Sequence, residues 1–152
     1  MNCVPKVFFF LLFFLSVSPV CFAQDDPPPV AMPKQQNLPI IDELIAVTAF
    51  KSYFLNYCER YITEAAQERG WNDEVKKLIT VSADFKYFKF NVQNLLALKS
   101  RKELLNLIEG YRKAPVESRR KNIIINSDMI QYNLKAFCRE LVRGSYMTRE
   151  QS

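Results

Sequence analysis

Apolar residues in the body of the chain recur three or four positions apart, which is the spacing of one face of an α-helix. The first run of this kind predicts a helix over residues 40–69. Pro39 near its start and Gly70 just past its end are typical helix boundaries. The body of the chain is therefore expected to begin with one long helix.

A second helix is expected to begin near Asp73, with Asn72 as the candidate N-cap. Its apolar stripe continues to Leu95. Residues 85–90, FKYFKF, could be interpreted as a strand. Helical spacing continues on both sides of this run, so we favour an unbroken helix.

Pro115 separates the third predicted helix from the last. Ser100 and Glu103 match the S-x-x-E capping box, and a helix is predicted over residues 101–113. Beyond Pro115, apolar residues seven apart would suit one long helix. The run Asn-Ser-Asp at residues 126–128 instead indicates a break with a fresh N-cap.

The first 23 residues are typical of a secretory signal peptide. Lys6 precedes the apolar run VFFFLLFFL, and small residues precede a cleavage position after Ala23. The run is shorter than the ~20 residues that a spanning helix needs, which disfavours a retained membrane anchor. We expect a secreted protein, periplasmic or extracellular, with no transmembrane segment in the mature chain. Residues 24–38 form a Pro-rich tether.

Cys58 and Cys138 are the cysteines that remain after this cleavage. An even pair in an exported protein predicts a disulfide, and two free buried thiols are the alternative. In an up-down bundle, a last helix that begins at Ser127 brings Cys138 to a height of ~28 Å, close to the ~27 Å of Cys58. A helix that begins at Pro115 does not. We therefore predict a short helix over residues 116–122 and a final helix over residues 127–143, which ends at Gly144.

These patterns together predict an all-α fold, an up-down helical bundle of four main helices plus a short helix, held by one disulfide. The bundle domain covers residues 39–144, and residues 145–152 are expected to be a flexible tail.

The chain has no histidine and three glycines among its 152 residues. The missing histidine excludes Ser-His-Asp and Cys-His nucleophile systems as well as His-ligated metals. Neither GxGxxG nor GxxxxGK[ST] occurs, and the carboxylates are scattered. We expect no metal, no cofactor and no enzymatic activity, with an enzyme of an unrecognised type as the alternative.

The net charge of +5 is divided unevenly along the chain. Residues 24–98 carry 8 basic and 10 acidic side chains, whereas residues 99–152 carry 12 and 6. In the predicted bundle, the turn before residue 101 lies at the same end as the last turn of the final helix, so basic residues should converge there. The candidate anion-binding residues are Lys99, Arg101, Lys102, Lys135, Arg139 and Arg143.

A secondary basic cluster consists of Arg112, Lys113, Arg119, Arg120 and Lys121. All of these groups have a simpler interpretation as solvated faces or as partners of helix dipoles. Asp42 and Glu43 would partly neutralise the predicted convergent end.

Two exposed aromatic candidates, Tyr87 and Phe90, are interleaved with Lys86 and Lys89. Aromatic and basic residues side by side suit a membrane interface, where rings insert and ammonium groups meet lipid phosphates. The same composition suits stacking on single-stranded nucleic acid, or ordinary packing in a small bundle.

In general type, the chain resembles small helical proteins that Gram-negative intracellular bacteria export through the type II secretion route. The resemblance rests on the leader MNCVPKVFFFLLFFLSVSPVCFAQ, the Pro-rich start, one cysteine pair and a body rich in Lys, Asn, Ile and Phe. It implies a bacterial effector that acts on host surfaces, for example on anionic headgroups such as phosphoinositides.

The leading hypothesis is a secreted, non-enzymatic helical binding protein whose basic C-terminal half engages an anionic partner. That partner is foremost a membrane lipid headgroup, with another polyanion as the broader class and only peripheral membrane contact. One alternative is a periplasmic or extracellular adaptor that binds a host or periplasmic protein through an apolar groove. The other is a carrier of a small apolar ligand inside the bundle.

Overall fold

The computed structural model of the protein describes residues 31–115 and 122–147. All regular elements in these ranges are helical, which confirms the predicted all-α class. The predicted signal peptide, most of the tether and the end of the predicted tail lie outside the described residues. So does the predicted short helix, apart from its last residue, Asn122.

The first predicted helix is two helices rather than one. A short 3₁₀ turn, η1 (Gln35–Asn37), leads into α1 (Leu38–Val47), and α2 (Phe50–Arg69) follows after a sharp change of direction. The break is at Ala49, which adopts a left-handed conformation with φ of 52°. Gly70, also left-handed, ends α2 where the sequence placed the boundary.

The second predicted helix is also broken. It comprises α3 (Asp73–Val81), a 3₁₀ turn η2 (Phe85–Tyr87) and α4 (Lys89–Leu96). Asn72 caps α3 as predicted, and its Oδ1 accepts from the backbone N–H of Val75 at 2.9 Å. The unbroken helix was wrong because Asp84 acts as a second cap, accepting from the N–H of Lys86 at 2.9 Å. No strand forms over residues 85–90.

The third and last helices follow the prediction closely. Helix α5 (Arg101–Lys113) begins with the capping box of Ser100 and Glu103, and α7 (Asp128–Leu141) is capped by Ser127. A turn at residues 123–126 precedes α7, as the predicted break requires, and the buried Oδ1 of Asn122 accepts from the N–H groups of Ile124 and Ile125, both at 2.9 Å.

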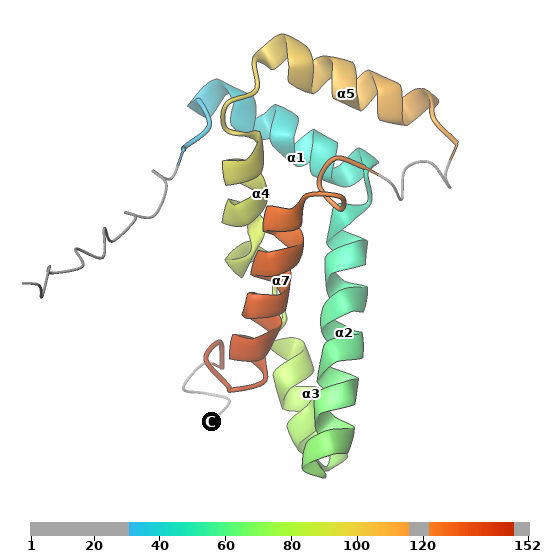
Figure 1. The fold of residues 1–152 in the computed structure, drawn as a ribbon, viewed down its shortest axis with the longest axis vertical. Helices are drawn as coiled ribbons and strands as arrows, with labels where there is room; N and C mark the ends of the chain where they lie inside the picture. Colours follow the sequence, from blue (N-terminus) through green and yellow to red (C-terminus); the bar gives the residue numbers. More distant parts are fainter. Residues whose placement is uncertain (1–30, 116–121, 148–152) are drawn as a thin grey trace, which may run out of the picture.

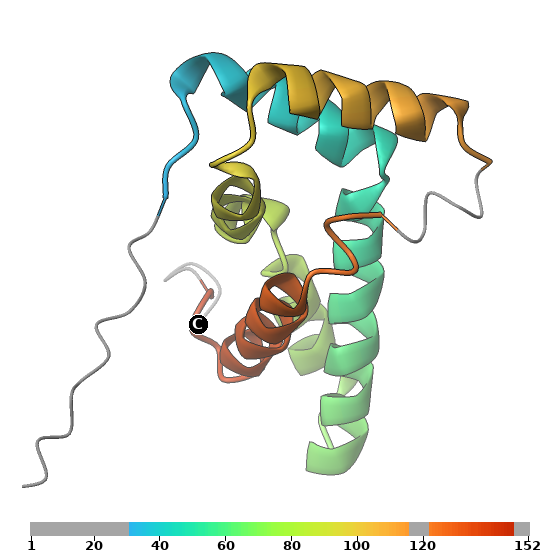
Figure 2. The ribbon, with the colours of Figure 1, turned by 45° about the horizontal axis from the view of Figure 1, so that its top comes forward.

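The helices are arranged differently from an up-down bundle (Figures 1 and 2). Helix α5 lies with α1 across one end of the molecule, whereas α2, α7 and the α3–α4 segment run along its length. Helices α2 and α7 are parallel: Tyr53 near the start of α2 bonds Gln131 near the start of α7 at 3.2 Å. Near their ends, Arg69 donates to the carbonyl of Val142 at 3.0 Å.

The core lies where these helices meet. Phe54 on α2 stacks at 5.3 Å from Phe88 and at 5.4 Å from Phe137 of α7, measured between ring centroids. Leu104 and Ile108 bury the inner face of α5. The largest fully buried side chains are Ile41, Leu44, Phe50, Phe54, Ile62, Phe88, Leu96, Leu104, Ile124, Ile130, Leu134 and Leu141.

The predicted disulfide is not formed in the structure. Cys58 and Cys138 are buried free thiols whose sulfur atoms lie 3.6 Å apart, so the predicted neighbours do meet. They meet because α2 and α7 are parallel, and each cysteine lies about a dozen ångströms into its helix. The hydrogen bond to Cys138, together with burial, raises the pKa of the Cys58 thiol.

Residues 145–147, the first part of the expected tail, pack against the body. The ring of Tyr146 lies 4.6 Å from that of Phe137 and 5.4 Å from that of Tyr87. Burial raises the pKa of Tyr146, with a smaller contribution from the nearby charge of Glu140.

Candidate functional site

The basic residues that were expected to converge lie at opposite ends of the molecule. Lys99, Arg101 and Lys102 stand at the start of α5, whereas Arg139 and Arg143 stand at the end of α7 (Figure 1). The expected convergence required α5 to run alongside the other helices. Because α5 crosses the end of the molecule on α1, the two groups form separate surfaces.

In the turn between α4 and α5, an exposed leucine directly precedes a run of basic residues. Leu98 has 90% of its surface exposed, and Lys99, Arg101 and Lys102 follow it in the sequence. One helical turn further along α5, Leu105 is 43% exposed. We name these residues, Leu98, Lys99, Arg101, Lys102 and Leu105, the α4–α5 patch.

Backbone and side-chain hydrogen bonds hold this turn in place. The N–H of Lys99 donates to the carbonyl of Leu96 at 3.1 Å. The carbonyl of Lys99 accepts from Nδ2 of the buried Asn37 at 3.3 Å, which ties the turn to η1. The Glu103 carboxylate accepts from both the N–H and the hydroxyl of Ser100 at 2.7 Å. The turn is thus bonded to α4, η1 and the first turn of α5.

The α4–α5 patch carries three basic side chains, with the carboxylate of Glu103 beside them. Lys99, Arg101 and Lys102 form no ion pair with any residue in the described ranges. The carboxylate of Glu103 accepts the capping hydrogen bonds from Ser100, which lower its pKa, and the positive charge of Lys99 lowers it further. The N-terminal end of α5 adds the positive pole of its dipole. The turn therefore has a net positive charge, from three basic side chains and one carboxylate.

The basic row on α7 is less available. Lys135, Arg139 and Arg143 are all exposed along one face, as their spacing predicted. Arg143, however, pairs with Glu140 at 2.6 Å. Arg139 makes no ion pair with any described residue, and it lines the same cavity as Glu64 and Glu68 of α2.

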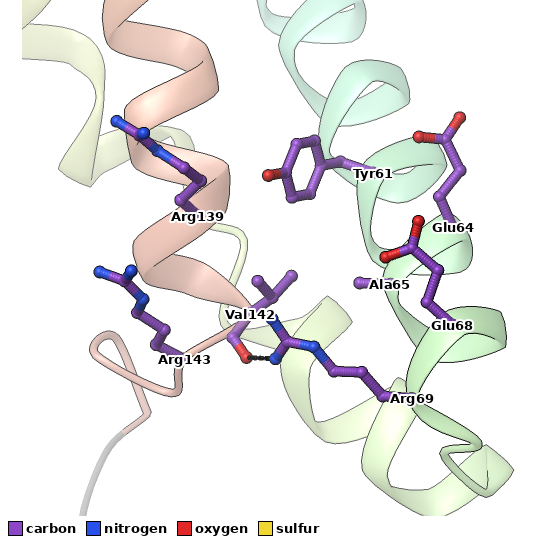
Figure 3. Close-up of a pocket in the computed structure, with 8 residues that line it drawn as sticks. All are labelled: Tyr61, Glu64, Ala65, Glu68, Arg69, Arg139, Val142 and Arg143. Carbon is purple, nitrogen blue, oxygen red and sulfur yellow. Dashed lines mark hydrogen bonds between the residues drawn. The ribbon is translucent and has the colours of Figure 1, made fainter.

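A cavity of about 340 Å³ separates α7 from the end of α2 (Figure 3). Its lining combines both signs of charge: Tyr61, Glu64, Ala65, Glu68, Arg69, Arg139, Val142 and Arg143. Arg69 spans the cavity to the carbonyl of Val142, whereas Arg139 and Arg143 extend away from Glu64 and Glu68. The two carboxylates weaken this end as an anion site.

The secondary basic cluster is partly paired and partly outside the described residues. Arg112 forms an ion pair with Glu43 of α1, and Lys113 pairs with Glu109 at 2.6 Å. Arg119, Arg120 and Lys121 lie outside the described residues.

The aromatic and lysine candidates are exposed but committed to local contacts. Lys86 pairs with Asp84 at 2.9 Å and lies 4.8 Å from the ring centroid of Tyr87. Lys89 pairs with Asp42 of α1 at 2.7 Å. Tyr87 and Phe90 remain partly exposed. Since both lysines have carboxylate partners, this group attracts anions less than the α4–α5 patch does.

Sequence reasoning missed Leu98, Leu105 and Asn37 as parts of the site. A signal for Leu98 exists, because it falls after the apolar stripe of α4 and two residues before the Ser100 cap. The described residues contain no group of three side chains arranged to hold a metal ion. In those same ranges, no helix has the length and apolar character needed to cross a membrane.

Comparisons with known proteins add no relative to this picture. No protein-family model matches the chain, and neither a curated protein nor a solved structure does. What the protein binds must therefore be inferred from its own residues. Among the candidate basic groups in the described ranges, the α4–α5 patch is the one in which three basic residues without an ion pair lie close together in the sequence.

Proposed function

We propose that the protein is an exported, non-enzymatic binding protein whose α4–α5 patch engages an anionic partner, foremost the phosphates of membrane lipid headgroups. The observation that carries the proposal is the unpaired charge of Lys99, Arg101 and Lys102 around the exposed Leu98. Among the other candidate basic residues in the described ranges, Lys86, Lys89, Arg112, Lys113 and Arg143 have carboxylate partners, whereas Lys135 and Arg139 form no ion pair there.

The strength of the attraction to an anionic membrane follows from the number of basic residues. Each Lys or Arg close to an anionic membrane contributes about 1 kcal/mol of attraction. Three such residues therefore supply about 3 kcal/mol, which is a little more than a hundredfold in the partition constant. This attraction decreases with ionic strength, because the Debye length shrinks from about 10 Å at 0.1 M salt to about 3 Å at 1 M.

Liposome co-sedimentation tests the proposal. The mature chain from Gln24 retains the whole described core, and it should sediment with vesicles of phosphatidylcholine and phosphatidylserine at low salt but not with phosphatidylcholine alone. The variant K99Q/R101Q/K102Q removes three charges without touching the core, and we expect it to lose about a hundredfold in partitioning.

A matched control removes the same number of charges from the other surface. The variant K135Q/R139Q/R143Q alters two exposed residues of α7 and one just after it, and it should retain most of the binding. Equal losses in the two variants would show that only net charge matters, and the patch would then be rejected. Binding to neutral vesicles as strong as to anionic ones would reject the headgroup proposal altogether.

We also propose that export converts the Cys58–Cys138 pair into a disulfide. Glutathione disulfide or a protein disulfide is the oxidant: two thiols lose two protons and two electrons, the S–S bond forms, and the donor disulfide is reduced to two thiols. The 3.6 Å between the buried sulfurs supports this, since the bond requires an approach of about 1.5 Å. Burial makes the reaction depend on opening of the α2–α7 contact.

A further inference from the structure

Leu98 is the most exposed large apolar side chain in the described part of the protein, at 90%. A single exposed leucine is common on protein surfaces and is not in itself evidence of a binding site. Two features distinguish this one. Three unpaired basic residues lie within four positions of it, and a second exposed leucine, Leu105, lies on the next turn of α5.

The turn that carries Leu98 is anchored. Ala97 before it is buried, Lys99 after it bonds both Leu96 and Asn37, and Ser100 caps α5. An apolar side chain presented by a fixed turn loses little conformational freedom when it is buried by a partner. The turn lies at the end of the molecule that α5 crosses, next to the start of α1 (Figure 2).

We infer that Leu98 inserts into the acyl boundary of an anionic phospholipid bilayer while Lys99, Arg101 and Lys102 meet the lipid phosphates. This inference rests on the proposed function and names its partner as a bilayer rather than a dissolved polyanion. A soluble polyanion offers phosphates or sulfates to the basic residues but no apolar layer for Leu98. A bilayer offers both at the depth expected of interfacial binding, about 5–10 Å.

The first test separates the leucine from the charges. L98S should reduce partitioning onto phosphatidylcholine–phosphatidylserine vesicles about tenfold or more, since a leucine side chain is lost from an apolar layer. Retention on heparin, a polyanion without an apolar layer, should not change. L55S is the matched control, because Leu55 on α2 is an exposed leucine, 40% accessible, away from the patch.

The second test measures insertion directly. The chain has one tryptophan, Trp71, in the turn after α2 at the end of the molecule opposite α5 (Figure 1). In vesicles that contain brominated phospholipid, the fluorescence of L98W should be quenched. The wild-type protein should not be quenched, since Trp71 faces away from the membrane in this orientation.

The outcomes distinguish the two claims. If L98S binds vesicles as well as the wild type and L98W is not quenched, insertion is wrong, yet the loss in K99Q/R101Q/K102Q would preserve the proposed function. If L98S weakens heparin retention and vesicle binding equally, Leu98 supports the turn rather than entering lipid, which also overturns the inference. If the charge variant binds like the wild type, both claims fail. Circular dichroism of each variant establishes that it is folded.

Discussion

Glu103 has a structural task in the middle of a basic surface. Its carboxylate accepts two hydrogen bonds from Ser100 at 2.7 Å and so begins α5, the helix that carries Arg101 and Lys102. The same bond fixes the end of the turn that presents Leu98. An acidic residue that looks unfavourable for an anion-binding surface is therefore part of what holds that surface in place.

This arrangement predicts a pH dependence of stability. The hydrogen bonds from Ser100 lower the pKa of Glu103 in the folded protein. The cap therefore contributes stability above the unfolded pKa of about 4.3, and the contribution is lost as pH falls through the lower folded pKa. Urea unfolding of wild type and E103A should show a difference at pH 7 that shrinks towards pH 3.

A neutral residue on the same helix provides the control. N106A, at an exposed position, should differ from the wild type by the same amount at every pH. A difference between wild type and E103A that grows on acidification would contradict the assignment of Glu103 as a charged cap.

At the scale of elements, the residues that cap helices could be predicted from the sequence, whereas the break between α1 and α2 could not. Asn72, Ser100 and Ser127 cap helices as predicted, because a side-chain cap needs only residues within a few positions. The break at Ala49 carries no glycine or proline to announce it. It is imposed by packing, since α1 must cross the end of the molecule under α5 while α2 runs along its length.

The strained backbone at Ala49 yields a second prediction. A left-handed residue with a Cβ costs about 1–2 kcal/mol, of which glycine recovers the steric part at an entropic cost of about 0.5–1 kcal/mol. A49G should therefore raise the free energy of unfolding by about 0.5–1 kcal/mol, because the exposed Ala49 methyl contributes little packing.

An alanine-to-glycine substitution within α1 should instead lower the free energy of unfolding. A46G, at an exposed helical position, should destabilise the protein by about 1 kcal/mol. Chemical denaturation of both variants measures the two effects together. A destabilised A49G would mean that Ala49 is not strained or that its methyl group packs against the body.

At the scale of the whole molecule, the sequence predicted the helices but not their directions. Apolar spacing determines which face of α5 is buried, and Leu104 and Ile108 are buried as expected. It does not determine whether that face packs alongside the bundle or across its end. The predicted convergence of basic residues from the start of α5 and the end of α7 required α5 to pack alongside the bundle. That prediction was wrong because α5 crosses the end of the molecule. Lys99, Arg101 and Lys102 lie together because they are neighbours in the sequence, and this does not depend on the direction of α5.

The parallel packing of α2 and α7 gives a prediction for the cysteine pair. A Cys58–Cys138 bond closes a loop of about 80 residues, which in the chain-entropy description adds about 4–5 kcal/mol to the free energy of unfolding. Protein oxidised with glutathione disulfide should therefore unfold at higher urea concentration than the reduced protein. In C138A, the oxidised and reduced samples should unfold at the same urea concentration. Two free thiols after oxidation, measured by mass spectrometry, would refute the proposal.

The position of α7 has a consequence for the order of events during folding. Phe137, in the last helix, completes a core in which it contacts Phe88 and Phe54, which lie 49 and 83 positions earlier in the chain. Contacts of such long sequence separation form slowly and late, because a long loop must close before they are made. A chain emerging from its N-terminus first therefore cannot close its core until α7 has emerged. That delay would keep the polypeptide unfolded and able to pass through a narrow translocation channel, as the proposed export requires.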